Sequence, residues 1–145
     1  IEQEVERLTR LVTIANQDGI LLTVSTLVGC HTQTPEQAVR LCEMVPGLGL
    51  TLDPSHYTIA PNNNKNYDMV FPHVRHVHLR DTGRGPNQFQ VRIGQGEVEY
   101  GRIISQLLRH RYQRSLSVDI RDIPDSPFPM QPEVRKLKYL LESLV

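Results

Sequence analysis

The apolar positions along the chain follow two periods, one typical of helices and the other typical of strands. One predicted helix begins at the capping box Thr34-Pro35-Glu36-Gln37, in which threonine caps the helix and proline opens it. The predicted helices cover residues 1–15, 34–45, 67–71, 100–108 and 132–144. Short runs rich in β-branched residues predict strands at 20–26, 48–53, 75–81 and 115–120. Helices and strands therefore alternate, which indicates a parallel sheet with right-handed crossovers.

Side chains within each predicted strand alternate between an apolar face and a polar face. The apolar set is Leu22, Val24, Leu50, Leu52, Val77, Leu79, Leu116 and Val118. The polar set is Thr23, Ser25, Thr51, Asp53, His76, His78, Ser117 and Asp119. A doubly wound sheet needs apolar residues on both faces, whereas a barrel with a ligand pocket at its mouth tolerates polar residues near the strand ends. We therefore predict an α/β fold, a parallel β/α (TIM-type) barrel to which this chain supplies about four strand-helix units.

Composition narrows the class of protein and its partners. Sixteen basic and sixteen acidic residues among 145 cancel, so no global field draws the chain to nucleic acid or to an anionic membrane. Cys30 and Cys42 form neither a CxxC pair nor a zinc spacing, which suits reduced thiols in the cytoplasm. No apolar run approaches the roughly 18 residues of a membrane span. We expect a small-molecule partner rather than nucleic acid or membrane.

Chemistry-bearing side chains stand at the carboxyl ends of the predicted strands, where β/α barrels place their sites. Asp53, His78 and Asp119 would meet there, and two carboxylates with an imidazole are suitable ligands for Mn, Mg, Co or Zn. A metal partner would also explain the acid Asp53, because an isolated buried charge is costly. His56, one short turn further on, could hydrogen-bond a substrate hydroxyl. His76, one step deeper on the same face, is expected to support the other site residues or to contribute to substrate binding.

Each of these residues also has an ordinary structural interpretation. An aspartate followed by Pro-Ser is often a turn residue, and a histidine in a strand is often only hydrogen-bonded. Arg80 and Asp81, which follow the third strand, are expected to form a surface ion pair.

Three segments resemble a known family when they are taken in order. GLTLDPSH, VRHVHLRD and IGQGEVEYGRII, followed by a strand that ends in an acid, are similar to the carboxyl-terminal half of the xylose-isomerase-like barrels, the sugar phosphate isomerase/epimerase group. The resemblance implies a metal site at the positions of Ser25, Asp53, His78 and Asp119. It also implies substrate binding by His56 and by Arg84, with Arg92 as the competing candidate.

The sequence departs from the family pattern at two ligand positions. Ser25 and Asp119 stand where the resemblance implies glutamates, and a neutral hydroxyl is neither a strong metal ligand nor a general base at neutral pH. One carboxylate, Asp119, is left to move a proton between adjacent carbons through a metal-bound enediol. The resulting hypothesis is a metal-dependent sugar or sugar-phosphate isomerase or epimerase, with isomerisation easier to support than epimerisation.

Two alternatives remain open at this point. A non-catalytic carbohydrate-binding barrel with a decayed metal site is favoured by Ser25. An apurinic endonuclease-like phosphodiesterase is disfavoured, because the neutral charge lacks a basic patch and Gln88 and Gln90 occupy the positions of additional metal ligands.

Four parallel strands cannot close a barrel, for which about eight are needed. The chain opens with Ile1 in an already helical pattern, so residues 1–145 are expected to be either a single domain or the carboxyl-terminal half of a barrel domain. The missing half would come from preceding residues of a longer protein or from a second copy that pairs edge to edge.

Overall fold

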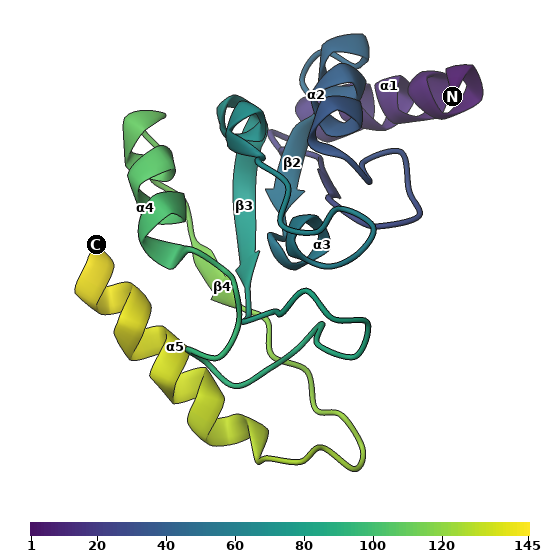
Figure 1. The fold of residues 1–145 in the computed structure, drawn as a ribbon. Helices are drawn as coiled ribbons and strands as arrows, with labels where there is room; N and C mark the ends of the chain where they lie inside the picture. Colours follow the sequence, from purple (N-terminus) through teal and green to yellow (C-terminus); the bar gives the residue numbers. More distant parts are fainter.

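The computed structural model describes residues 1–145 and contains one four-stranded parallel sheet (Figure 1). Its strands, in chain order, are β1 (Thr23–Ser25), β2 (Gly49–Leu52), β3 (Val74–Leu79) and β4 (Leu116–Val118). The strand order in the sheet is the order along the chain, and all three neighbouring pairs are parallel. This arrangement is part of the wall of a β/α barrel, which confirms the predicted fold class.

The helices follow the predicted pattern closely. They are α1 (Glu2–Gln17), α2 (Pro35–Met44), α3 (Ser55–Thr58), the 3-10 helix η1 (Asp68–His73), α4 (Tyr100–Arg109) and α5 (Met130–Leu144). The predicted capping box opens α2: the Gln37 amide donates to Thr34 Oγ1 at 3.2 Å, and the Thr34 amide donates to Gln37 Oε1 at 3.1 Å. The short α3 is not among the predicted helices, and α5 begins before the predicted Pro132.

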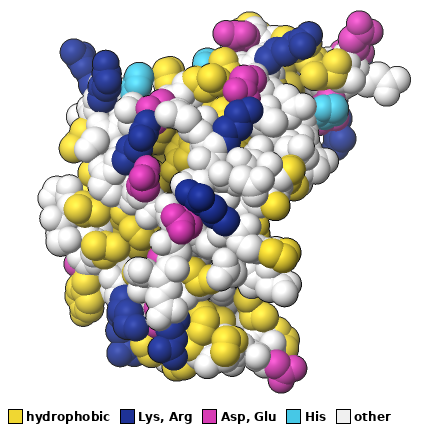
Figure 2. Space-filling model, viewed as in Figure 1, with side chains coloured by type: hydrophobic (Ala, Val, Ile, Leu, Met, Phe, Trp, Pro, Cys, Tyr) yellow, Lys and Arg dark blue, Asp and Glu magenta, His cyan; other side chains and the backbone are white.

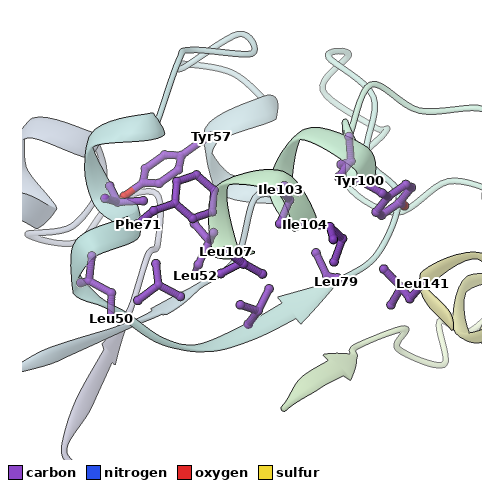
Figure 3. Packing of buried hydrophobic residues seen from close by; sticks show 14 of the residues in the cluster. Leu50, Leu52, Tyr57, Phe71, Leu79, Tyr100, Ile103, Ile104, Leu107 and Leu141 are labelled. Atoms are coloured by element: carbon purple, nitrogen blue, oxygen red, sulfur yellow. The ribbon is translucent and has the colours of Figure 1, made fainter. Parts of the chain in front are cut away.

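The apolar face of the sheet packs against helices, as the alternation predicts. Leu50, Leu52 and Leu79 are fully buried and belong to one cluster with side chains of α4 and α5 (Figure 3). The α4 and α5 members of that cluster are Tyr100, Ile103, Ile104, Leu107, Leu137 and Leu141. A smaller cluster joins α1 to α2 through Leu8, Val12, Leu41, Val45 and Leu48. Helices α1 and α2 therefore lie toward one end of the sheet and α4 and α5 toward the other (Figure 1).

The opposite face of the sheet is polar, and its side chains bond across strands. Thr23 Oγ1 and Thr51 Oγ1 lie 2.8 Å apart, and Ser117 Oγ lies 3.0 Å from His76 Nε2. Charged side chains of both signs are interspersed over the molecular face in Figure 2. The strand arrowheads in Figure 1 all point toward α3 and the long loop after β3, so the polar rows end there.

Candidate active site at the carboxyl ends of the strands

Four predicted site residues come together at this edge of the sheet. Asp53 directly follows β2, Asp119 directly follows β4, and His78 lies between them near the end of β3. The parallel register pairs His78 with Ser117, and the Asp119 amide donates to Leu79 O at 2.8 Å. His78 Nδ1 lies 3.6 Å from Asp119 Oδ2, and His56 Nε2 lies 3.8 Å from Asp53 Oδ2.

Arg80 stands at the centre of this group, and the expected surface pair of Arg80 with Asp81 is wrong. The Arg80 side chain is 1% exposed. Its Nη1 donates to both Asp53 oxygens at 3.1 and 2.9 Å, its Nη2 donates to Asp119 Oδ2 at 2.6 Å, and its Nε donates to Asp119 O at 2.9 Å. Strand alternation places Arg80 two residues beyond His78 on the same inward face, and this periodicity is the sequence signal that could have revealed it.

Asp53 is held from several directions. Its side chain is 6% exposed, and besides Arg80 its Oδ1 accepts the Ser55 amide at 3.1 Å. Its backbone amide donates to Thr26 Oγ1 at 2.9 Å. The acid is therefore a paired buried charge, and Pro54-Ser55 also gives it the turn role that sequence reasoning considered.

His56 lies on α3 over the Asp53 side of the group. The Val28 amide donates to its Nδ1 at 3.2 Å, so the neutral ring carries its proton on Nε2, the atom facing Asp53. Burial lowers the pKa of His56; the Asp53 carboxylate opposes this change, whereas the Arg80 and Arg121 guanidinium groups add to it. His56 is therefore a neutral hydrogen-bonding group at neutral pH.

His76 and His78 stack along β3 below the strand end. Their rings meet edge to face with centroids 4.9 Å apart, and His76 Nε2 bonds with Ser117 Oγ. Burial and the neighbouring His78 lower the pKa of His76. His76 thus contacts His78 from beneath, and its expected role beside the substrate stays a prediction.

Three other candidates form no recorded hydrogen bond or ion pair with the four-residue group of Asp53, His56, His78 and Asp119. Ser25 lines a separate pocket with Val24 and Leu27, and the Ser25 carbonyl accepts the Thr32 hydroxyl. Arg84 is exposed, with Nη2 3.9 Å from Glu97 Oε2. Arg92 lies over the Phe128 ring, 5.2 Å from its centroid. The assignment of a substrate-binding arginine stays a prediction.

The donors as arranged do not fit a divalent ion. Arg80 already bonds the carboxylates of both Asp53 and Asp119, and no group of three or more His, Cys, Asp or Glu side chains is placed to hold a metal. Ser25, at the position of a family glutamate, is the last residue of β1 beside β2 and offers only a neutral hydroxyl. The assignment of Asp53, His78 and Asp119 as metal ligands therefore stays a prediction without support from this geometry.

Asp81 has a structural task that the sequence analysis missed. Its side chain accepts the amides of Thr82 at 3.0 Å, Gly94 at 2.7 Å and Gly96 at 3.0 Å. Gly94 has φ +94°, and a Cβ on Gly96 would overlap the Asp81 carboxylate. The RD and IGQG motifs thus form one unit, which folds the long loop back onto the end of β3.

The two glutamines at the endonuclease ligand positions also hold this loop. Gln88 Oε1 accepts the Gly85 amide at 3.0 Å. Gln90 Nε2 donates to Arg121 O at 2.7 Å, and Gln90 Oε1 accepts the Arg121 amide at 2.9 Å. Gln90 thereby ties the loop after β3 to the loop after β4, and neither glutamine contributes a side chain to the four-residue group.

Comparison with known proteins agrees with this architecture. The sequence model of a family described as xylose isomerase-like TIM barrel matches residues 1–141. The chain belongs to this family. An inosose dehydratase of Bacillus licheniformis is 27% identical over 93% of the chain, and the match spans 51% of that protein. The chain therefore spans about half the length of this curated relative.

Solved structures share the fold. A xylose isomerase-like TIM barrel protein from Mycobacterium smegmatis in complex with magnesium has a TM-score of 0.77 at 22% identity, over 99% of the chain and 50% of that structure. An L-ribulose 3-epimerase has a TM-score of 0.72 at 16% identity, over 97% of the chain and 53% of that structure. Four strands of this chain correspond to half of a family barrel. No helix is both long enough and apolar enough to cross a membrane.

Proposed function

We propose that the barrel to which this chain contributes is a sugar isomerase or epimerase type of enzyme that moves a proton next to a carbonyl group. Three facts support the proposal: the family, the polar group at the strand ends, and the names of the relatives, which describe an inosose dehydratase and an L-ribulose 3-epimerase. The substrate class is a small sugar or sugar phosphate.

The observation that carries the proposal is the unequal exposure within the group. The Asp53 and Arg80 side chains are buried, whereas the Asp119 and His78 side chains remain 28% and 35% exposed. His78 Nδ1 lies 3.6 Å from Asp119 Oδ2. A carboxylate beside an imidazole is a suitable pair for proton transfer near neutral pH. Asp119 and His78 are therefore the most exposed members of the group and the first that a substrate would contact.

Asp119 serves as the base in the proposed reaction. When it removes the proton beside the carbonyl, the C–H electron pair forms a C=C bond and the carbonyl oxygen gains negative charge. His78 donates a proton to that oxygen, which gives an enediol. Asp119 then returns its proton to the adjacent carbon while His78 takes back a proton from the other hydroxyl, whose oxygen becomes the new carbonyl. Arg80 keeps the Asp119 side chain in place through its Nη2 bond to Oδ2, which leaves Oδ1 for the substrate. His56 and Arg84 are proposed to hold substrate hydroxyls or phosphate.

The experiment is a screen of aldoses, ketoses and their phosphates for exchange of the α-proton with deuterated solvent, using the full-length protein. We expect Asp119→Asn to lower the exchange rate by about 10²-fold or more, since the base is lost. Asp122→Asn changes an exposed acid in the following loop and is expected to leave the rate unchanged, as is Ser25→Ala. Equal exchange by wild type and Asp119→Asn would contradict the proposed role.

A non-catalytic carbohydrate-binding barrel is the second candidate, and two observations favour it. Arg80 bonds both carboxylates of the group, and Ser25 offers a neutral hydroxyl where the family pattern has a glutamate. Calorimetric sugar binding without any α-proton exchange across the whole screen would select this candidate over the enzyme.

A further inference from the structure

We propose that Arg80 is the resident cation of this site, and that its guanidinium takes the place between Asp53 and Asp119 which the family pattern assigns to a divalent ion. The full protein then binds no divalent metal at this position. This inference concerns binding alone, so it holds for an enzyme and for a carbohydrate-binding barrel alike.

The hydrogen bonds of Arg80 compensate the negative charges of Asp53 and Asp119, so a side chain of the protein itself fills the role of a bound cation. All three guanidinium nitrogens donate: Nη1 to both Asp53 oxygens, Nη2 to Asp119 Oδ2, and Nε to Asp119 O. A planar guanidinium suits this task because its five donors form a rigid fork that addresses two carboxylates from different directions, whereas a lysine ammonium is a compact point charge without such a fork.

The surroundings of Arg80 enclose its charge. The guanidinium carbon lies 4.7 Å from the centroid of the Phe89 ring, at a distance typical of a cation-π contact. Phe89 also packs against His56, with ring centroids 4.9 Å apart. With 1% of its side chain exposed, Arg80 is fixed in the interior of the group rather than reaching in from solvent.

A divalent ion and Arg80 are mutually exclusive at this position. An ion that bound Asp53 and Asp119 would displace the guanidinium from both carboxylates and leave a buried cation beside a second positive charge. Removing the partner of a buried charge is strongly unfavourable, because the charge is left without compensation in a low-dielectric site. The neutral Ser25 adds a separate argument. It stands where the family pattern has a glutamate, so one negative charge that would help to neutralise a divalent ion is missing.

The test titrates the full-length protein with Mn²⁺, Mg²⁺, Co²⁺ and Zn²⁺ after chelation, using calorimetry and the thermal midpoint. We expect wild type to show no saturable binding that depends on Asp53, and no change of midpoint between chelator and Mn²⁺. Arg80→Met frees both carboxylates while it keeps the aliphatic stem, and it is expected to bind Mn²⁺ about tenfold tighter or more. Adding Asp53→Asn to Arg80→Met should remove that gain.

Two further variants make the result decisive. Arg121→Met changes an exposed arginine of the loop after β4 and should leave Mn²⁺ binding as in wild type. Arg80→Lys keeps a positive charge but loses the fork, so a smaller gain than in Arg80→Met is expected, and this variant also tests the inference if Arg80→Met does not fold. Stoichiometric metal in wild type that Asp53→Asn abolishes would overturn the inference. A folded Arg80→Met protein without any gain in affinity would overturn it as well.

Discussion

At the scale of single residues, two buried tyrosines differ in one hydrogen bond. The Tyr57 hydroxyl donates to Thr32 O at 3.2 Å, whereas the buried Tyr100 hydroxyl has no partner among the protein groups. Buried polar groups stabilise a fold only when they are paired. The two positions therefore form a natural comparison within one core cluster.

We predict that Tyr57→Phe lowers the free energy of unfolding of the full protein by about 1 kcal/mol, because a buried hydrogen bond is lost. Tyr100→Phe removes an unpaired hydroxyl and should leave that free energy unchanged or slightly higher. Urea unfolding followed by circular dichroism measures both values. Equal losses in the two variants would show that Tyr100 has a partner in solution.

Glu133 on α5 gives a prediction for pH dependence. Its carboxylate accepts the Ile93 amide and the Lys136 ammonium, each at 2.8 Å. Burial alone would raise the pKa of Glu133, but these two contacts, joined by the charge of Arg92, outweigh burial and hold the pKa below its ordinary value.

A carboxyl whose folded pKa is depressed stabilises the fold above its unfolded pKa, and this contribution is lost as the pH falls through the folded pKa. We therefore predict that Glu133→Gln lowers the thermal midpoint most near neutral pH and that the difference from wild type shrinks in acid. Glu142→Gln, at an exposed position of the same helix, is the control and should show little difference at any pH. A Glu133→Gln effect that is constant across pH would contradict the assignment.

At the scale of elements, the loop after β3 is organised by the carboxylate of Asp81. This carboxylate collects the amides of Thr82, Gly94 and Gly96, and an isolated antiparallel bridge pairs Asp81 with Val91. The loop therefore folds as a unit. It begins at Asp81, directly after Arg80, which is the last inward-facing residue in line with His76 and His78. Its geometry and the position of Arg80 are coupled through adjacent residues.

We predict that Gly96→Ala destabilises the protein by about 1–3 kcal/mol, since the added Cβ overlaps the Asp81 carboxylate and the Thr82 amide and must displace the turn. Gly101→Ala is the matched control, because a Cβ there meets no atom within 4 Å. Gly101 is an exposed position of α4, so alanine should stabilise the helix by about 0.5–1 kcal/mol. Equal effects of the two substitutions would refute the close packing at Gly96.

At the scale of the whole molecule, the described sheet has two edges. β1 pairs only with β2, and β4 pairs only with β3, so each has a row of backbone groups without a strand partner. Large apolar side chains are also exposed, among them Leu11, Ile14 and Ile20. Open edges and exposed apolar groups are templates for association.

We predict that residues 1–145 expressed alone do not form a stable monomer, because the inward polar face has no opposite wall and both sheet edges stay open. Light scattering coupled to size-exclusion chromatography should show association, and thermal unfolding should lack a sharp transition. A compact monomer that melts cooperatively would contradict the interpretation that these residues are half of a barrel and need the other half to be stable.

The sequence by itself determined the order of the four strands and of every helix except the short α3, the two faces of the sheet and the meeting of Asp53, His78 and Asp119. These features follow from local rules, since a period of two assigns strand faces and parallel strands end at one edge. Strand lengths were less well predicted: β1 and β4 have three residues each, fewer than their apolar runs indicate, and both are edge strands.

Only the tertiary structure decided which partner the inward charges take. Arg80 and Asp81 are neighbours in sequence and look like a surface pair, but they project in different directions, toward two carboxylates and toward three loop amides. Those partners lie between 13 and 39 residues away, except the adjacent Thr82, and no local pattern records such distances along the chain. Periodicity determines the side of the strand on which a side chain emerges, whereas the packing of distant strands and loops determines what it meets there.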